Sequence, residues 1–349
     1  MHKATFLEGT IRFTIAPDGP ILIKAGESGG GDPTLPDMQF VRSQGRIYLP
    51  GPSLKGVVRA QCERICRSLD GPTRYDLARQ RQRQRQRRHQ NEFIPPLADN
   101  PLVERSRYQA YTRGGDELRF SSGIYFEELR NGDAAADTAL IYRRSALVSQ
   151  IFGHTSLAGR VRFADAYPTG EVLIEERNGV AIDRIYGSVA VGPFNYETVV
   201  QGAFATRIDF KNLTLAQLGL LGLALRDLAE GRVGIGFGKS RGLGRVTITF
   251  DDLRIFYPTC ELVNGALRLL NGREVAPAGK LAGLGALCAD ERYQGYALPP
   301  HEVDLADLPA GSAYQPDEIM GVSLTATGNE QVRAIWKACM PAWRWEVGL

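Results

Sequence analysis

Two aspartates, Asp32 and Asp37, lie in or next to a segment rich in glycine and proline (residues 25–36), which cannot support regular structure and is predicted to be a loop. A helix that carries Lys55 and Arg59 is predicted to follow. A loop carboxylate beside a cationic helix can hold Mg²⁺ near a phosphate, or help to remove the proton from a 2′-hydroxyl that then attacks its own phosphodiester. The alternative is that such an aspartate caps a turn, as most loop aspartates do, and the residue types alone favour this alternative.

The predicted helix begins after Pro50-Gly51-Pro52, and its apolar residues recur at spacings of four, four, three and four over residues 54–69. Ser53, Lys55 and Arg59 are candidates for phosphate contacts, because a helix N-terminus with Lys and Arg side chains is a ready anion site. Lys55 or Arg59 could also offset negative charge in a transition state. The alternative is that these residues form a solvated helix face.

A second candidate site is the glycine-rich run at residues 231–245, GRVGIGFGKSRGLGR. A Walker loop would need glycine where Val233 stands, and no G-x-G-x-x-G register fits, so nucleotide hydrolysis is not supported. Glycines do allow close approach of the backbone, and the cations among them suit contact with phosphates. The predicted contacts are therefore Gly236, Gly238, Lys239, Arg241 and Arg245. The alternative is a plain flexible connector.

The elements that must position these residues follow a simple order. Strands are predicted at residues 5–15, 202–210 and 245–250, and a second helix is capped by Thr214 and ended by Gly231. Strand, helix, strands, helix, strand outline a βαββαβ unit. We therefore predict an α+β, modified ferredoxin-like fold, which is the layout of many RNA-recognition sheets.

Two parts of the chain fit this unit poorly. Residues about 71–140 are predicted to be a basic insertion, whose Arg-Gln tract at 79–90 has no apolar anchor and is expected to be mobile. Residues 91–140 alternate short apolar pieces with polar turns, which predicts β-hairpins. Residues 251–349 contain no periodic element, and their tryptophans are expected to pack on the main domain or on a neighbouring subunit: Trp336, Trp343 and Trp345.

Charge and cysteine usage narrow the class of protein. The chain has 349 residues and a net charge of +3, but residues 41–90 alone hold 13 Lys and Arg against 3 acidic residues. This suits nucleic acid, and the Arg-Gln tract could make loose, non-specific RNA contacts, although a solvated basic face is the alternative. Five scattered cysteines and the absence of a long apolar run predict a cytoplasmic protein without a membrane span. Cys62 and Cys66 could bind zinc with His89, but cysteines on an apolar helix face are usually core residues.

Four motifs together resemble one family. The sequence YLPGPSLKGVVR at residues 48–59 is similar to the signature I-P-G-S-S-L-K-G-x-x-R of the RAMP superfamily, and the glycine-rich run resembles its second hallmark. Residues 151–166 (IFG, then AGRVRFADA) and residues 181–204 (AIDR, leading to GAF) are similar to the backbone subunits of CRISPR type III effectors. The resemblance spans residues about 5–250 in the expected order.

The resemblance implies a subunit that sits on CRISPR guide RNA among other RAMP-family effector subunits, in an antiviral ribonucleoprotein. It implies a palm over residues 1–250, a thumb at about 171–200 that kinks the guide–target duplex, and a C-terminal extension, residues 251–349, of unknown role. In this family an acidic loop residue cuts complementary target RNA with Mg²⁺ or another divalent cation, and Asp37 is the corresponding residue, with Asp32 as the second candidate. Tyr186, in the thumb, is expected to wedge against a base, the alternative being that it packs inside the thumb.

Two other functions stay open within the same superfamily. One is a non-catalytic subunit that caps an end of the complex. The other is a stand-alone endonuclease that processes guide RNA with a His, Tyr and Lys acid-base set, for which only His154 lies in a motif region. Many backbone subunits have zinc-type cysteines just before the Phe-Gly motif, where this chain has Ser149 and Gln150, so no structural zinc is expected.

Overall fold

An antiparallel sheet forms the frame of the computed structural model, which describes residues 4–26, 36–84, 93–100, 102, 121–131 and 138–349. Within these residues the sheet is seven-stranded, in the order β15-β16-β9-β1-β8-β4, with β5 also paired to β8. Its strands are β15 (Tyr314–Pro316), β16 (Val322–Thr327), β9 (Val246–Tyr257), β1 (Glu8–Pro17), β8 (Phe204–Lys211), β4 (Val161–Phe163) and β5 (Tyr167–Pro168).

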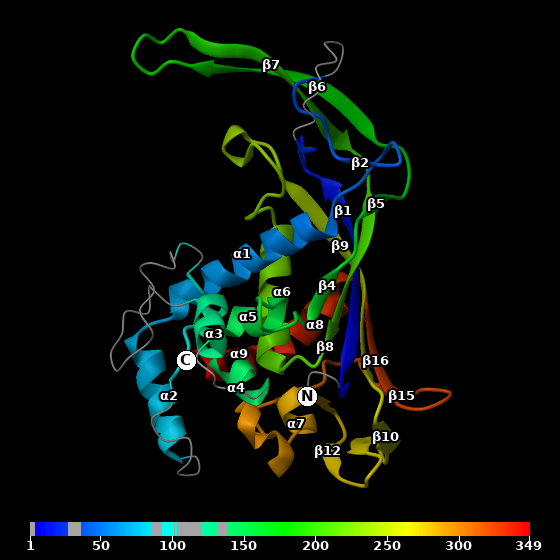
Figure 1. Cartoon of the computed structure of the whole chain (residues 1–349). Helices are drawn as coiled ribbons and strands as arrows, with labels where there is room; N and C mark the ends of the chain where they lie inside the picture. Colours follow the sequence, from blue (N-terminus) through cyan, green and yellow to red (C-terminus); the bar gives the residue numbers. More distant parts are fainter. Residues whose placement is uncertain (1–3, 27–35, 85–92, 101, 103–120, 132–137) are drawn as a thin grey trace.

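The sheet is amphipathic because its side chains alternate between two faces. In β1, Ile11, Phe13 and Ile15 are buried, whereas Arg12 between them is exposed. The helices all lie on the apolar side of this sheet (Figure 1). They are α1 (Gly51–Leu69), α2 (Pro72–Gln84), α3 (Ser122–Asn131), α4 (Thr138–Arg144), α5 (Leu147–Phe152), α6 (Leu215–Ala229), α7 (Leu284–Leu287), α8 (Gly328–Ala338) and α9 (Met340–Val347).

The strand order confirms the predicted ferredoxin-like fold. The four central strands, β9-β1-β8-β4, are the fourth, first, third and second strands of a βαββαβ unit, and all neighbours are antiparallel. Helix α1 connects β1 to β4, and α6 connects β8 to β9. The fold class is therefore α+β, as the sequence predicted.

Helix ends agree with the sequence signals. Thr214 and Gln217 form a capping box at the start of α6, each side chain bonding the other's backbone N–H at 3.2 Å. Gly231, which follows α6, has a φ of +68° and turns the chain. Helix α1 starts where Asp165 accepts a hydrogen bond from Gly51 N at 2.7 Å. Glycine is required there, since a Cβ on Gly51 would lie 2.3 Å from the carbonyl oxygen of Phe163.

The structure has helices in parts of residues 79–140, where a mobile tract and β-hairpins were predicted. Helix α2 continues through Gln84, so the tract begins as a helix: Arg81 lies 4.0 Å over the Trp345 ring and donates to the Trp345 carbonyl at 2.7 Å. Arginine stems can cover apolar surface, which supplies the missing anchor. The hairpins predicted in 91–140 are wrong for residues 122–131 and 138–140, which are helical in α3 and α4. Residues 85–92 and 103–120 lie outside the described part.

The C-terminal segment completes the palm. The boundary expected at residue 250 falls inside β9, and β16 pairs with the distal part of this strand. Trp336 on α8 is buried edge-on against Phe250 at 4.8 Å. Buried Asp304 accepts the N–H groups of Leu215 and Gly285 at 2.7 and 2.6 Å, which joins the segment to the start of α6. Burial raises the pKa of Asp304 to about 7, although these two hydrogen bonds oppose the shift.

Smaller elements surround this core. Short ladders join β2 to β3, β10 through β12, and β13 to β14, and a long hairpin is formed by β6 and β7. None of the helices in the described residues is long and apolar enough to cross a membrane. The remaining bounds are β2 (Arg42–Ser43), β3 (Arg46–Ile47), β6 (Leu173–Ile182), β7 (Val189–Gln201), β10 (Cys260–Val263), β11 (Ala266–Leu269), β12 (Glu274–Ala276), β13 (Lys280–Ala282) and β14 (Leu305–Asp307), with 3₁₀ turns at Lys239–Arg241 and Glu291–Tyr296.

Candidate nucleic-acid interface

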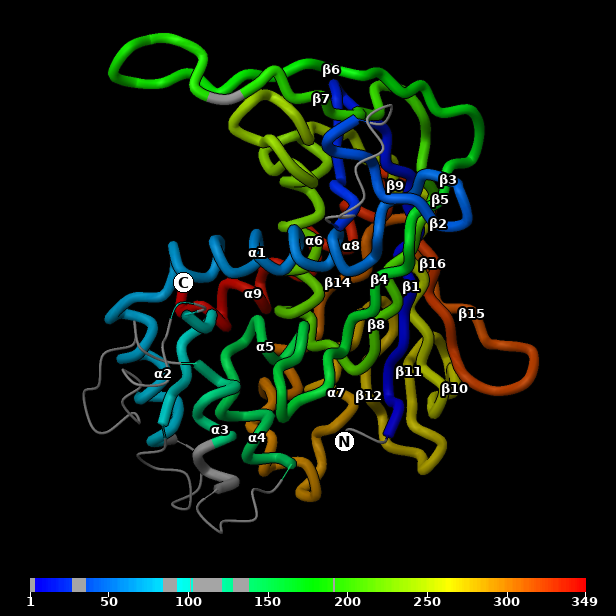
Figure 2. Tube along the Cα trace, turned by 45° about the horizontal axis from the view of Figure 1, so that its top comes forward, coloured from blue at the N-terminus to red at the C-terminus, as the bar shows by residue number. Residues whose placement is uncertain are grey.

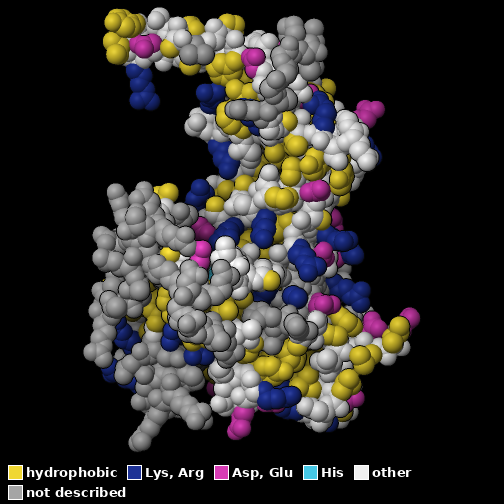
Figure 3. Space-filling model, in the orientation of Figure 1, with side chains coloured by type: hydrophobic (Ala, Val, Ile, Leu, Met, Phe, Trp, Pro, Cys, Tyr) yellow, Lys and Arg dark blue, Asp and Glu magenta, His cyan; other side chains and the backbone are white. Residues whose placement is uncertain are grey.

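The β6–β7 hairpin, in the range for which a thumb was expected, projects beyond the sheet. It extends over α1, and the glycine-rich loop, residues 231–245, lies between the hairpin and this helix (Figures 1 and 2). The surface is hollowed between the hairpin and the body, with Lys and Arg side chains along the hollow (Figure 3). This concave, cationic arrangement is where an extended polyanion would fit.

The glycine-rich loop has a fixed shape. Phe237 N donates to the carbonyl of Leu22 at 2.7 Å, and Gly244 N donates to that of Pro20 at 2.9 Å. Gly236 has a φ of +73°, and a Cβ there would lie 2.1 Å from the Leu22 oxygen. Gly238, also with positive φ, precedes the 3₁₀ turn that presents Lys239. The alternative of a plain flexible connector does not describe this anchored loop.

The loop cations differ in their surroundings. Arg245 forms an ion pair with Asp18 at 2.8 Å. The guanidinium of Arg241 lies over the rings of Phe194 and Phe237, 5.4 and 6.0 Å from their centroids, so this residue connects the loop to β7. Lys239 is exposed, and partial desolvation together with the nearby Arg64 of α1 lowers its pKa. The loop and α1 therefore present cations toward a shared surface.

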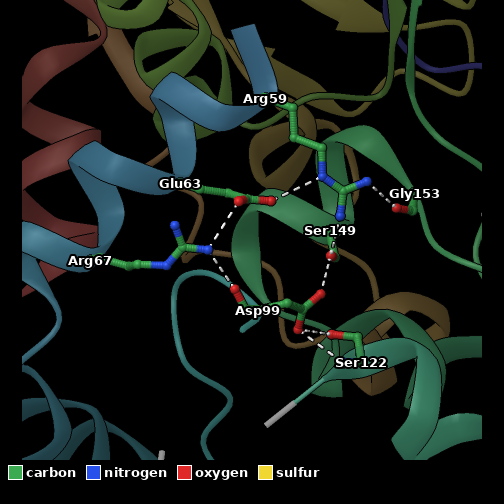
Figure 4. Close-up of polar contacts among 7 residues, drawn as sticks. All are labelled: Arg59, Glu63, Arg67, Asp99, Ser122, Ser149 and Gly153. Atoms are coloured by element: carbon green, nitrogen blue, oxygen red, sulfur yellow. Dashed lines mark hydrogen bonds and ion pairs between the residues drawn. The ribbon is translucent and has the colours of Figure 1, made fainter. Parts of the chain in front are cut away.

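The three residues of α1 that were predicted to contact phosphates differ in their surroundings. Ser53 and Lys55 are half-buried in the first turns, and desolvation followed by repulsion from Arg59 lowers the pKa of Lys55. Arg59 instead turns to protein groups: it binds Glu63 at 3.1 Å and donates to the Gly153 carbonyl at 3.1 Å (Figure 4). Its guanidinium is held within the protein, so Lys55 is the better candidate for contact with a phosphate.

The Arg59 contacts belong to a network that sequence analysis missed. Glu63 bridges Arg59 and Arg67, and Arg67 donates to the Asp99 carbonyl at 2.7 Å. The buried Asp99 carboxylate accepts three hydrogen bonds, from Ser122 N at 2.9 Å, Ser122 Oγ at 2.8 Å and Ser149 Oγ at 2.5 Å (Figure 4). The network joins α1, α3 and α5 behind the hollow. The spacing of Arg59, Glu63 and Arg67 at i, i+4 was the one available sequence signal.

Asp37 lies beside the middle of β7. Its side chain is exposed, and Oδ2 accepts a hydrogen bond from Asn195 N of β7 at 2.9 Å. The next residue, Met38, pairs with Tyr196 in parallel register, through Met38 N to the Asn195 carbonyl at 3.1 Å and Glu197 N to the Met38 carbonyl at 2.9 Å. Asp37 is therefore fixed to β7 at the residue that follows Phe194, whose ring Arg241 contacts. Asp32 lies outside the described residues.

Three consecutive residues hold these parts together. Ile21 exchanges backbone hydrogen bonds with Val199 of β7, at 2.9 Å each. The carbonyl of Leu22 accepts a hydrogen bond from the glycine-rich loop. The carbonyl of Ile23 accepts one from Val41 N at 2.9 Å, four residues after Asp37. The β6–β7 hairpin, the glycine-rich loop and the segment that carries Asp37 are therefore all bound to the same three buried residues.

A divalent cation fits Asp37 only if other ligands come from outside the protein. Within the described residues, no group of three or more His, Cys, Asp and Glu side chains could hold a metal ion. Mg²⁺ commonly keeps several waters and binds through one or two carboxylates together with substrate phosphates. The exposed carboxylate of Asp37 suits that kind of shared site.

The two cysteine candidates are core residues, and His154 is half-buried. Cys62 and Cys66 are fully buried, and desolvation raises the pKa of both thiols. His89 lies outside the described residues. His154 accepts from Ser156 N at Nδ1, 3.3 Å, and its Nε2 lies 2.9 Å from Ser145 Oγ, which is the pattern of a neutral ring. Burial lowers its pKa, as expected for such a ring.

The tip of the β6–β7 hairpin exposes apolar and aromatic side chains. At the tip, Tyr186 and Ile185 are each 82% exposed, so Tyr186 does not pack inside the hairpin.

The open face of the sheet carries paired charges, such as Arg12 with Asp252 at 3.1 Å. RNA-recognition sheets stack bases on aromatic residues of that face, and its charge pairs do not suit such stacking. The hollow is therefore a better candidate for the interface than the open face of the sheet.

A ferredoxin-like palm with a projecting hairpin and an anchored, cationic glycine-rich loop defines an RNA-binding class of α+β protein. Residues 15–247 match the family model of the RAMP superfamily. Because this match covers more than half of the chain, the protein belongs to the RAMP superfamily, which is associated with CRISPR RNA-binding complexes.

One curated relative shows a more limited likeness. An 84-residue stretch is 34% identical to a glucosamine-6-phosphate deaminase of Mycolicibacterium smegmatis. The aligned stretch covers 23% of this chain and 32% of the relative. A match over so little of either chain does not show a shared family.

Proposed function

We propose that this chain is a backbone subunit of a CRISPR type III effector that binds guide RNA and cleaves complementary target RNA through Asp37. The observation that carries the proposal is the hydrogen bond between Asp37 and Asn195, which fixes an exposed carboxylate to β7, the strand whose Phe194 contacts Arg241 of the glycine-rich loop. Fold and family support RNA binding, and this placement supports chemistry beside β7.

Guide binding uses backbone contacts and does not read sequence. Lys239 and Arg241 on the loop and Lys55 on α1 neutralise phosphates, and the first turn of α1, with Ser53, adds backbone N–H groups. The positive φ of Gly236 and Gly238 brings the loop backbone close to the strand. Tyr186 at the hairpin tip stacks on a base where the hairpin crosses the guide–target duplex.

Cleavage requires a carboxylate next to the distorted target strand. Bound Mg²⁺ would supply charge neutralisation at the scissile phosphate. Asp37 accepts the proton of the target 2′-hydroxyl, whose oxygen attacks the adjacent phosphorus; the bond to the 5′-oxygen breaks, and that oxygen takes a proton from water. Lys55 lies on the neighbouring helix and offsets the added negative charge.

A non-catalytic capping subunit is the second candidate. It is favoured by the finding that Asp37 is a single carboxylate, without a cluster of metal-ligating side chains in the described part of the chain. The stand-alone endonuclease is not supported in the same way, because His154 is half-buried, neutral and stacked on Phe126 at 5.6 Å.

The test is cleavage of an end-labelled complementary RNA by the reconstituted complex with Mg²⁺. Asp37→Ala is expected to remove one cut, or a regular ladder of cuts, without loss of RNA binding. Asp251→Ala, an exposed aspartate on the open face of the sheet, is the matched control and should cut normally. An unchanged pattern for Asp37→Ala would move the chemistry to Asp32 or to another subunit and favour the capping role.

A further inference from the structure

The segment that carries Asp37 (residues 36–42) lies alongside β7 and is joined to it by an isolated β-bridge. On one side Met38 pairs with Tyr196, and on the other side the Gln39 carbonyl accepts from Ala25 N at 2.9 Å. Backbone pairing of this kind extends over only a few residues. A side-chain contact is therefore needed to hold the segment in one register, and Glu197 of β7 supplies it.

Glu197 binds this segment at two places. Its Oε2 accepts from Phe40 N at 2.8 Å and from Arg42 Nη1 at 2.8 Å, while Oε1 forms a shorter contact with Arg42 Nη2. Arg42 Nη1 also donates to the Phe40 carbonyl at 3.1 Å. The Glu197 side chain is only 12% exposed. Burial opposes its ionisation, but the hydrogen bonds from Arg42 and Phe40 N prevail and lower its pKa.

The hairpin by itself does not need Glu197 to be charged. In the β6–β7 register Glu197 lies directly opposite Glu176. Like charges in opposed positions of an antiparallel pair are destabilising. Arg42 offsets this repulsion from outside the hairpin, which indicates that the carboxylate serves the junction between β7 and the Asp37 segment.

We infer that Glu197 and Arg42 are positioning residues that hold Asp37 against β7, an inference that rests on the proposed cleavage function. Glu197 is two residues from Asn195, whose N–H binds Asp37, and Arg42 is five residues beyond Asp37 on the clamped segment. Neither residue is among the groups assigned to RNA. Loss of the clamp should therefore displace the carboxylate without weakening RNA binding.

The experiment compares Glu197→Ala, Glu197→Gln and Glu175→Ala in the reconstituted complex. Glu175 lies on the same hairpin in an exposed ion pair with Arg177 at 3.2 Å and serves as the matched control. The readouts are the single-turnover cleavage rate, the Mg²⁺ concentration for half-maximal rate, the RNA dissociation constant, and amide hydrogen exchange over residues 36–42.

Glu197→Ala should slow cleavage about 10- to 100-fold, because small displacements of a catalytic group have effects of this size. It should also raise the half-maximal Mg²⁺ concentration and speed exchange at Phe40, while RNA affinity stays unchanged. Glu197→Gln keeps an acceptor for Phe40 N and should fall between Glu197→Ala and wild type. It also guards against a folding defect in the alanine variant.

The outcomes separate this inference from the proposed function. If Asp37→Ala abolishes cleavage but Glu197→Ala leaves both the rate and the exchange unchanged, only the positioning role is overturned. An equal loss of cleavage and RNA affinity would likewise overturn it, because it would indicate a general structural role. If Asp37→Ala leaves every cut in place, the proposed function fails and this inference fails with it.

Discussion

Gly236→Ala should disable the glycine-rich loop, and Gly242→Ala is its matched control. Both glycines belong to the same loop and both have left-handed φ values, +73° and +81°. A Cβ at Gly236 would lie 2.1 Å from the Leu22 oxygen, whereas a Cβ at Gly242 would meet no atom within 4 Å. Comparison of the two variants therefore separates the effect of the close approach to Leu22 from the cost of a positive φ in a residue other than glycine.

The left-handed conformation costs a non-glycine residue roughly 1–2 kcal/mol. Gly242→Ala should show this cost alone, reduced by the lower entropy of its unfolded chain. Gly236→Ala adds the strain of overpacking, about 1–3 kcal/mol. It also breaks the bond from Phe237 N to the Leu22 carbonyl, worth about 1 kcal/mol. The free energy of unfolding should thus fall by about 2–4 kcal/mol more for Gly236→Ala than for Gly242→Ala.

Urea denaturation measures these free energies, and a filter-binding titration of guide RNA at several salt concentrations measures the effect on the site. Gly236→Ala should weaken RNA binding about tenfold, because displacement of the loop moves Lys239 and Arg241, and a loss of 1.4 kcal/mol corresponds to this factor. Equal destabilisation by both substitutions, or unchanged RNA affinity of Gly236→Ala, would refute the assignment of this loop as an anchored phosphate-binding element.

Two further predictions concern buried carboxylates. Asp99→Ala leaves two seryl hydroxyls and one N–H group without their acceptor, so the free energy of unfolding measured with urea should fall by about 2–4 kcal/mol. Asp76 is exposed, so Asp76→Ala should change this free energy little. Equal effects of the two substitutions would contradict a stabilising role of the Asp99 network. For Asp304 the folded pKa of about 7 lies above the unfolded value of about 3.9, so the folded state binds the extra proton between these values. The free energy of unfolding should therefore decrease as the pH rises from about 4 to about 7. Asp304→Asn should remove this dependence, and an identical pH profile would disprove the assignment.

The palm could be predicted because its signals are local. The period of α1, the capping box at Thr214 and the alternation in β1 each lie within a few residues, and their order determines the βαββαβ unit. The C-terminal part could not be predicted in this way. Strand β16 is six residues long and depends on pairing with β9, about seventy residues earlier in the chain, which no local pattern reveals.

Motif spacing indicates which loops to consider but not the directions of their side chains. Lys239 and Arg241 lie in the glycine-rich loop, and Asp37 is bound to β7. Arg59 has the same charge as Lys55 and lies one turn along the helix, yet it faces Glu63 and Gly153. Asp99 has no sequence neighbour in the network that it completes, so only the folded chain brings it into contact with Ser149.

The anchor at Ile21, Leu22 and Ile23 joins the glycine-rich loop, the β6–β7 hairpin and the segment that carries Asp37. Loops tolerate functional residues best when a rigid scaffold fixes their ends. Here the carbonyls of Leu22 and Ile23 bind the glycine-rich loop and the segment that carries Asp37, while Ile21 in the same short segment pairs with β7. A shift of this short segment would move all three together.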